Sequence, residues 1–280
     1  MSSPRSLTDR SVSENGVRLR FGGTADGPVL LMLHGALVNG DVWYGLESIL
    51  GERWPGSWLV PDLPGHGRST RLSHYSYGRM AAHVAQAVAE HVTPGTPVHV
   101  LGHSLGGAVA LTLASGWFGI DVSTVCAIGV RPAWSDSEKA MLAAVAAAPA
   151  RVFASRDEAV CQVLRVAAMD DVVDPGSALC DSLVIGDGDQ WEMVADSASL
   201  AVGAPDLPGL LAACRAQETV LATGEHDPLS QPRDLVSLRS EATVLAGAGH
   251  NPHLQNPEYV WPLLDHLYLS MLHRPSQTQF

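Results

Sequence analysis

Residues 98–107 read VHVLGHSLGG, an apolar run that leads into a glycine-rich turn with one serine at its centre. The apolar run predicts a buried strand, and the small and apolar residues after the turn predict a helix from Leu105. A Gly-x-Ser-x-Gly sequence between a strand and a helix is typical of a sharp turn that exposes a nucleophilic serine, here Ser104. Side chains at positions 102 and 106 would collide in such a turn, so glycine is needed at both. A phosphate-binding loop would need Gly-Lys-Ser/Thr, which is absent.

The chain around this turn alternates between apolar runs and segments with helical spacing. The apolar runs that predict strands are Val29–Leu33, Leu59-Val60, Val98–Leu101, Val122–Val130, Thr219–Ala222 and Ala242–Ala246. Helices are predicted over Tyr77–His91, Leu105–Trp117 and Pro257–Leu272, and Asn15-Gly16 predicts a hairpin turn between two short strands. Strands that are apolar on both faces and alternate with helices favour an α/β fold, with a mostly parallel central sheet flanked by helices.

One long segment interrupts this alternation, between the predicted strands at 122–130 and 219–222. Residues 131–210 have a helical pattern broken by Pro, Gly and Asp, and no strand is predicted there. An insertion of this length is more typical of a packed cap than of a structureless loop. We therefore expect a core domain of residues 1–130 and 211–280. Residues 131–210 are expected to form a helical cap, or lid, that covers Ser104 and controls substrate choice.

Four further motifs lie at or after predicted strands. They are LHGA at 33–36, PDLPGHGRS at 61–69, GEHDP at 224–228 and GHNPH at 249–253. Together with the serine turn they resemble the α/β-hydrolase superfamily of serine esterases and lipases, in which the catalytic residues follow the order Ser, Asp, His. The resemblance covers nearly the whole chain outside residues 131–210. It implies an α/β-hydrolase fold with a helical cap insertion.

The resemblance also implies a catalytic triad of Ser104, Asp227 and His250. A serine hydroxyl is a poor nucleophile at neutral pH, so His250 would take its proton and later pass it to the leaving group. Asp227 would hold the imidazole in one tautomer and stabilise the imidazolium. Asp227 and His250 each follow a predicted strand, which places them at the same carboxyl edge of a parallel sheet as Ser104. The backbone N–H groups of Ala36 and Leu105 are the expected oxyanion hole.

Neighbouring residues offer alternatives for two of these roles. Glu225 and His226 flank Asp227, but only Asp227 occupies the family position directly before proline. His253 lies close to His250, and we expect it to pack behind the loop because the family's base directly follows small residues.

Substrate contacts are less sharply indicated. Arg131 and Trp134 follow the strand predicted at 122–130, so they lie near the catalytic edge. Arg131 could bind a substrate carboxylate and Trp134 could form an apolar wall, but a salt bridge and a packed indole fit the sequence equally well. Apolar residues between 163 and 194, Met169 and Trp191 among them, could line the pocket or form the cap's own core.

The composition argues against some classes of partner and cofactor. The chain has 280 residues, with 17 Lys and Arg against 29 Asp and Glu, and the net charge of −12 argues against nucleic acid as a partner. There is no His-Glu-x-x-His, no Cys-x-x-Cys and no Gly-x-Gly-x-x-Gly after the first strand of the sheet, so neither a metal nor an organic cofactor is expected. The four cysteines are expected to be reduced thiols.

The polar segment Met1–Asn15 lacks the apolar core of a secretory signal, and no run is long enough to span a bilayer. These features predict a cytoplasmic protein that does not use a membrane, and they leave its oligomeric state open.

The expected function is a serine hydrolase that cleaves a carboxylic ester, or a related lactone or thioester, through an acyl-enzyme intermediate. Its partner would be a small-molecule, ester-like substrate. A carbon–carbon bond hydrolase of the same fold is the nearest alternative. A ligand-binding, receptor-like protein on a hydrolase scaffold is an alternative from a different functional class. The acyl and alcohol groups of the substrate are not indicated by the sequence.

Overall fold

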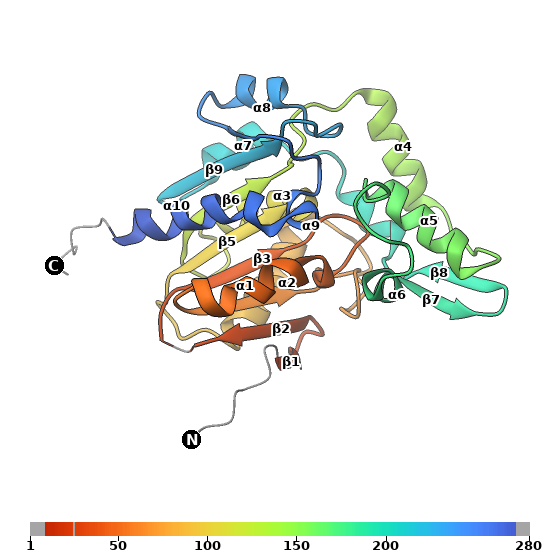
Figure 1. The fold of residues 1–280 in the computed structure, drawn as a ribbon, viewed down its shortest axis with the longest axis horizontal. Coiled ribbons are helices and arrows are strands. Elements are labelled where there is room, and N and C mark those ends of the chain that lie inside the picture. The colour runs from red at the N-terminus through yellow and green to blue at the C-terminus, as the bar shows by residue number, and fades with distance from the viewer. Residues whose placement is uncertain (1–8, 25, 273–280) are drawn as a thin grey trace.

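The computed structural model describes residues 9–24 and 26–272, so most of the segment Met1–Asn15 lies outside the described residues. The described residues form an α/β fold around one central sheet (Figure 1). Its strand order is β1-β2-β4-β3-β5-β6-β9-β10. The strands are β1 (Asp9–Val12), β2 (Arg18–Gly23), β3 (Val29–Leu33), β4 (Ser57–Pro61), β5 (Val98–His103), β6 (Val122–Ile128), β9 (Glu218–Gly224) and β10 (Thr243–Leu245). β1, β2 and β4 pair antiparallel, and the remaining pairs are parallel. The predicted fold class is confirmed.

Helices cover both faces of this sheet. On one face lie α2 (Tyr77–Ala89), α3 (Leu105–Leu113) and α7 (Leu207–Ala213). On the other lie α1 (Tyr44–Arg53) and α10 (Trp261–Leu272), which are nearest the viewer in Figure 1. Successive residues of β3 alternate between the two layers: Leu31 and Leu33 pack with α2 and α3, whereas Leu30 and Met32 pack with α1 and α10. Burial on both faces explains why the strands are continuous apolar runs.

The part of the chain between β6 and α7 lies beyond the carboxyl ends of the parallel strands (Figure 1). It contains α4 (Asp136–Ala147), α5 (Arg156–Val166), α6 (Ala178–Leu183), β7 (Val184–Asp187), β8 (Gln190–Met193) and the 3-10 helix η2 (Ser197–Val202). The expectation that residues 131–210 contain no strand was wrong, because β7 and β8 form an antiparallel hairpin. The hairpin is short and mostly exposed, and Gly186 and Gly188 occupy positive-φ positions, so it lacks the apolar alternation that would have revealed it.

The far boundary of that segment also differs from expectation. Residue 210 falls inside α7, and α7 packs against α3 through the fully buried Leu207. The chain has therefore rejoined the layered core before residue 210. All four cysteines are unpaired. Within the described residues, no helix combines the length and the apolarity that crossing a bilayer requires.

Candidate active site

Ser104 occupies the turn between β5 and α3 in a strained backbone conformation. Its φ is 51° and its ψ is −114°, a region that residues with a side chain rarely adopt. The surrounding glycines are required by contact. A Cβ added to Gly102 would lie 2.4 Å from the carbonyl oxygen of Gly106, and one added to Gly106 would lie 2.3 Å from that of Leu33. The turn therefore projects Ser104 from the carboxyl edge of the sheet at the first turn of α3.

His250 and Asp227 meet at the same edge. Nδ1 of His250 lies 2.9 Å from Oδ2 of Asp227, although the residues are 23 positions apart in the chain. Oδ1 of Asp227 accepts hydrogen bonds of 2.8 Å from the backbone N–H groups of Leu229 and Ser230. Asp227 and His250 are both buried, with Asp227 only 3% exposed. Because the carboxylate only accepts, Nδ1 of His250 carries the proton and Nε2 is left as a base.

The electrostatics keep Asp227 ionised. Burial by itself would raise the pKa of this carboxyl group. The hydrogen bond and charge of His250, together with the N–H donors of Ser230 and Leu229, outweigh that effect, and the pKa of Asp227 is lowered. Among the described residues, the Ser104 hydroxyl forms no hydrogen bond with His250. Such contacts often tighten only when substrate is bound.

The turn after β3 is positioned by a buried histidine. Nε2 of His34 accepts a 2.8 Å hydrogen bond from the backbone N–H of Leu63, and its Nδ1 lies 2.8 Å from the carbonyl oxygen of Gly35. Burial lowers the pKa of His34 to about 4, so the ring is neutral at pH 7. Ala36 follows, and Leu37 has a positive φ of 62°. This geometry places the turn beside Ser104, whose Cβ would lie 3.6 Å from a Cβ added to Gly35.

The two backbone groups expected to form an oxyanion hole lie beside one cavity. Ala36 and Leu105 both line it, as do Ser104 and His250. Leu105 is the first residue of α3, so its N–H has no acceptor within the helix, and the positive end of the helix dipole adds to its field.

Three nearby residues were not recognised as part of the site from the sequence. His103 donates from Nε2 to the backbone oxygen of His250 at 2.8 Å, and its buried ring lies 4.8 Å from that of His250. Asn251 donates from Nδ2 to the carbonyl oxygens of Ala167 and Ala168, which ties the histidine loop to the end of α5. The Thr223 hydroxyl lies 3.2 Å from Oδ2 of Asp227. Their adjacency to the motifs was the available signal, because His103 precedes Ser104 and Asn251 follows His250.

The competing residues lie apart from the Asp227–His250 pair. His226 and Glu225 have exposed side chains 69% and 52% accessible, and they face each other rather than His250. His253 is buried, and its ring packs 4.3 Å from Trp43 and 4.7 Å from His103.

The cavity has a volume of about 500 Å³ and an apolar lining. The core contributes residues beside Ser104 and at the end of β6, and the insertion contributes residues of α4, α5, β8 and η2. The Asp-rich parts of the insertion lie elsewhere: Asp170, Asp171, Asp174, Asp187 and Asp189 are exposed, and none lines the cavity.

Arg131 and Trp134 both line this cavity, but Arg131 is already paired. Its NH2 group donates to Oε1 of Glu138 at 2.5 Å, and its Nε donates to the carbonyl oxygen of Ala133. The guanidinium also lies 4.4 Å from the centre of the Trp134 ring. Hydrogen bonds from Ser135 and Arg131 lower the pKa of Glu138 to about 2, so this carboxylate is ionised. The salt bridge and packed indole, offered as alternatives above, are what the structure contains.

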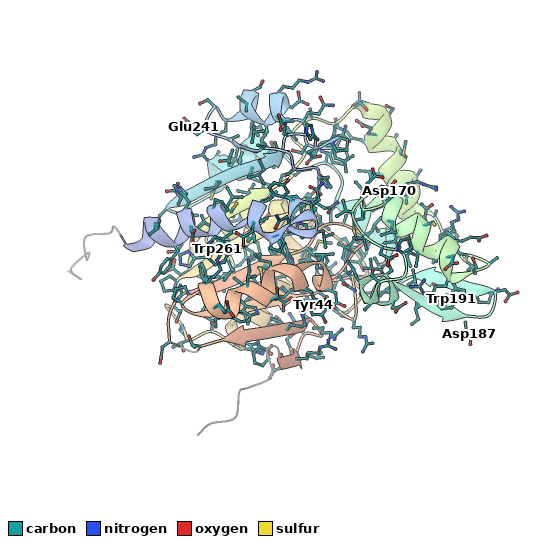
Figure 2. All side chains as sticks on the ribbon, viewed as in Figure 1. Tyr44, Asp170, Asp187, Trp191, Glu241 and Trp261 are labelled. Carbon is teal, nitrogen blue, oxygen red and sulfur yellow. The ribbon has the colours of Figure 1, made fainter. Side chains whose placement is uncertain are left out.

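Most of the apolar residues considered for a pocket roof form the insertion's own core. Met169 is fully buried among Val163, Leu164 and Leu183, away from the cavity. Trp191 lies on the β7–β8 hairpin near its outer end, where its backbone pairs with Phe153 (Figure 2). Met193 and Val166 do line the cavity. Periodicity could not separate the two groups, because both surfaces need apolar residues.

The described residues contain no group of three or more His, Cys, Asp or Glu side chains arranged to hold a metal ion. The several histidines around the site are held by backbone and ring contacts instead.

The sequence of the chain matches a known protein family and parts of several curated proteins. The sequence profile of the Alpha/beta hydrolase family matches residues 30–262. The magnesium-chelatase 30 kDa subunit of Rhodobacter capsulatus is 44% identical over 94 residues, which are 33% of this chain and 32% of that protein. A pimeloyl-[acyl-carrier protein] methyl ester esterase of Aeromonas hydrophila is 40% identical over 97 residues, which are 34% of each chain. The chain thus matches about a third of the length of these curated relatives.

Solved structures extend the likeness to the whole fold. A thioesterase domain from the curacin biosynthetic pathway superposes with a TM-score of 0.72 at 21% identity, covering 94% of this chain and 99% of that one. An esterase of M. tuberculosis superposes with a TM-score of 0.74 at 22% identity, covering 95% and 93%. At these identities the superpositions concern the fold alone.

Proposed function

The chain belongs to the alpha/beta hydrolase family, and we propose that it cleaves carboxylic esters, or related lactones and thioesters, through an acyl-enzyme intermediate. Ser104 would be the nucleophile, His250 the general base and acid, and Asp227 the residue that orients His250. Relatives and structural neighbours named as esterases and as a thioesterase support this class of reaction.

In the first half of the reaction, Ser104 Oγ attacks the acyl carbon while Nε2 of His250 accepts the hydroxyl proton. The imidazolium that forms is stabilised through Nδ1–H by the ionised Asp227 at 2.9 Å. Negative charge develops on the former carbonyl oxygen, where the N–H groups of Ala36 and Leu105 would donate to it. The tetrahedral intermediate then collapses, the C–O bond to the alcohol breaks, and His250 protonates the departing oxygen.

In the second half, water replaces the alcohol. His250 takes a proton from a water molecule, the resulting hydroxide attacks the acyl carbon, and Ser104 departs as the alcohol with the proton returned by His250. The products are a carboxylic acid and free enzyme. Every proton transfer in this cycle uses Nε2 of His250.

One observation carries the proposal: the strained Ser104 turn opens onto a cavity that His250, already paired with Asp227, also lines. Positive-φ strain at a residue with a side chain is costly, about 1–3 kcal/mol, and it persists where function requires it. Ligand binding alone does not require a strained serine turn.

The test combines labelling with turnover. We expect a fluorophosphonate probe to label the wild-type protein and p-nitrophenyl esters to be hydrolysed. The Ser104→Ala variant should lose labelling and about 10⁴- to 10⁶-fold of its turnover, because no other group can replace the nucleophile. Its thermal unfolding temperature should be unchanged, since alanine keeps the Cβ of Ser104 and the hydroxyl forms no hydrogen bond among the described residues.

Cys161→Ser is a suitable control, since this exposed thiol lies outside the proposed machinery and the variant should label and turn over like the wild type. Full ester turnover by folded Ser104→Ala protein would rule the mechanism out. Labelling without hydrolysis of any ester, lactone or thioester would point instead to a carbon–carbon bond hydrolase or a binding protein.

A further inference from the structure

We propose that the cavity beside Ser104 is an acyl-chain subsite. An uncharged alkyl chain of the substrate packs there against the apolar face of α4, which forms one wall of the cavity. This inference rests on the proposed ester hydrolysis and names the substrate class: esters of medium-length, saturated or otherwise apolar carboxylic acids. The occupant of the α4 face is thus the substrate itself.

The apolar residues of α4 lie on one side of the helix. Glu138, Met141, Leu142 and Val145 line the cavity, and they are spaced at i, i+3, i+4 and i+7. This spacing places them on a single helical face. The opposite face carries small or polar residues, such as Lys139 and Ala143. The helix is therefore amphipathic, with its apolar side turned toward the cavity that contains Ser104.

The helix packs against η2, but η2 does not cover that apolar side. None of the residues of α4 is buried, and Met141 and Val145 are 64% and 43% exposed. A helix in a folded domain normally buries its apolar stripe. The capping box formed by Ser135 and Glu138, together with the high alanine content, stabilises α4 without such burial. The stripe remains available for another apolar surface.

The size and lining of the cavity indicate that an alkyl chain of the substrate supplies this apolar surface. Its volume of about 500 Å³ falls in the range that encloses a drug-sized ligand, roughly 300–1,000 Å³, so an acetyl group would leave most of it unfilled. Val166 of α5, Met193 of β8 and Leu200 of η2 continue the apolar lining around α4. A chain attached to the acyl carbon at Ser104 would extend among these side chains.

Charge excludes an acidic or basic tail. Arg131 is the cation that lines the cavity among the described residues, and Glu138 and the Trp134 ring already occupy its guanidinium. A substrate carboxylate at this guanidinium would share it with the ionised Glu138 and would be repelled by that carboxylate. A neutral alkyl chain meets no such repulsion. The paired charges thus favour apolar chains over dicarboxylate half-esters.

The test is a chain-length series of p-nitrophenyl esters from acetate to decanoate, below their aggregation limits. For the wild type we expect kcat/KM to rise about three- to fourfold per added methylene until the cavity is filled. The Leu142→Ser/Val145→Ser variant should have a decanoate-to-acetate ratio of kcat/KM at least about tenfold below that of the wild type, because the added methylenes lose their apolar wall. Both substituted residues are unburied, so the fold should be unaffected.

The matched control is Ala143→Ser/Ala144→Ser, which puts two serines on the opposite, exposed face of the same helix. Its chain-length ratio should equal that of the wild type. A flat wild-type profile, or equal effects of the two variants, would overturn the inference while leaving ester hydrolysis intact. So would a change in sedimentation coefficient of Leu142→Ser/Val145→Ser with an unchanged ratio, since the α4 face would then bind another protein chain.

A second readout does not depend on turnover. Decan-1-ol should raise the unfolding temperature of Ser104→Ala protein, and Leu142→Ser/Val145→Ser in that background should reduce the increase. An increase equal in both backgrounds would contradict the subsite. If decan-1-ol binds as expected while no ester is hydrolysed and no probe labels Ser104, the proposed function fails and the apolar subsite stands.

Discussion

His103 connects three pieces of the site through one buried ring. It precedes Ser104 in the chain, its Nε2 donates to the backbone oxygen of His250, and a Cβ at Gly35 would lie 2.9 Å from its Nδ1. Burial, with a further contribution from His250, lowers the pKa of His103 to about 3, so the ring is neutral at pH 7. A neutral ring with its proton on Nε2 can hold the His250 loop without adding charge beside His250.

We expect His103→Phe to lower kcat by about ten- to hundredfold with KM unchanged. Phenylalanine fills the space but leaves the His250 carbonyl oxygen without its donor, at a cost of about 1–3 kcal/mol that misplaces the base. Labelling by a fluorophosphonate should slow by a similar factor. His103→Gln, whose amide can reach the same oxygen, should recover most of the rate.

A purely structural role for His103 would give a different pattern. Both variants would then lower the unfolding temperature while leaving kcat per folded molecule unchanged. Equal kcat values for the phenylalanine and glutamine variants would also contradict positioning through the hydrogen bond.

At the scale of elements, β2 and α1 are joined by a buried ion pair. Arg20 of β2 and Glu47 of α1 are 3% and 4% exposed, and Arg20 also pairs with Asp41. Burial raises the pKa of Glu47 even though Arg20 lies against it. Removal of Arg20 would leave Glu47 without a compensating charge in a low-dielectric setting.

Arg20→Met should therefore lower the free energy of unfolding by about 3–5 kcal/mol, measured by urea denaturation at pH 7. Arg20→Met/Glu47→Leu should recover much of this loss, because an apolar pair of similar size needs no charge compensation. The control is Arg53→Met, which removes a partly exposed pair with Glu258 and should cost less than about 1 kcal/mol. A loss below 1 kcal/mol for Arg20→Met would show that water compensates Glu47.

Across the whole molecule, several histidines are buried in the neutral state. Burial lowers the pKa of His34 to about 4, and lowers those of His66 and His103 to about 3. The unfolded chain binds these protons near pH 6.5, whereas the folded chain excludes them until far lower pH. Between these values the unfolded state holds more protons, so stability rises with pH and is lost as the pH falls below about 6.5.

We expect the free energy of unfolding to fall by about 2 kcal/mol per buried ring between pH 7 and pH 5. The slope of that free energy against pH is set by the number of protons taken up on unfolding, and His66→Gln should reduce this number by up to one. His74→Gln, which changes an exposed histidine, should leave the slope unchanged. An unchanged slope in His66→Gln would contradict the assignment, whatever its stability at pH 7.

Local sequence determined much of this molecule. The apolar runs predicted β3 at its observed bounds and located β5, β6, β9 and β10, because strands buried on both faces must be continuously apolar. The short, mixed segments that form α1, α8 (Pro232–Leu238) and the β7–β8 hairpin carry no such periodicity and were not predicted. Ser104, Asp227 and His250 were predicted to meet because each follows a parallel strand, and all parallel strands end at one edge.

Only the tertiary structure decided which side chains face one another. Arg131 pairs with Glu138 rather than remaining free, His103 reaches the His250 loop 147 residues away, and Met169 points into the insertion's core instead of the cavity. A hydrophobic pattern records that a side chain is apolar, but its partner is set by elements distant in the chain. The same reason hid the exposed apolar face of α4 until the fold placed it beside Ser104.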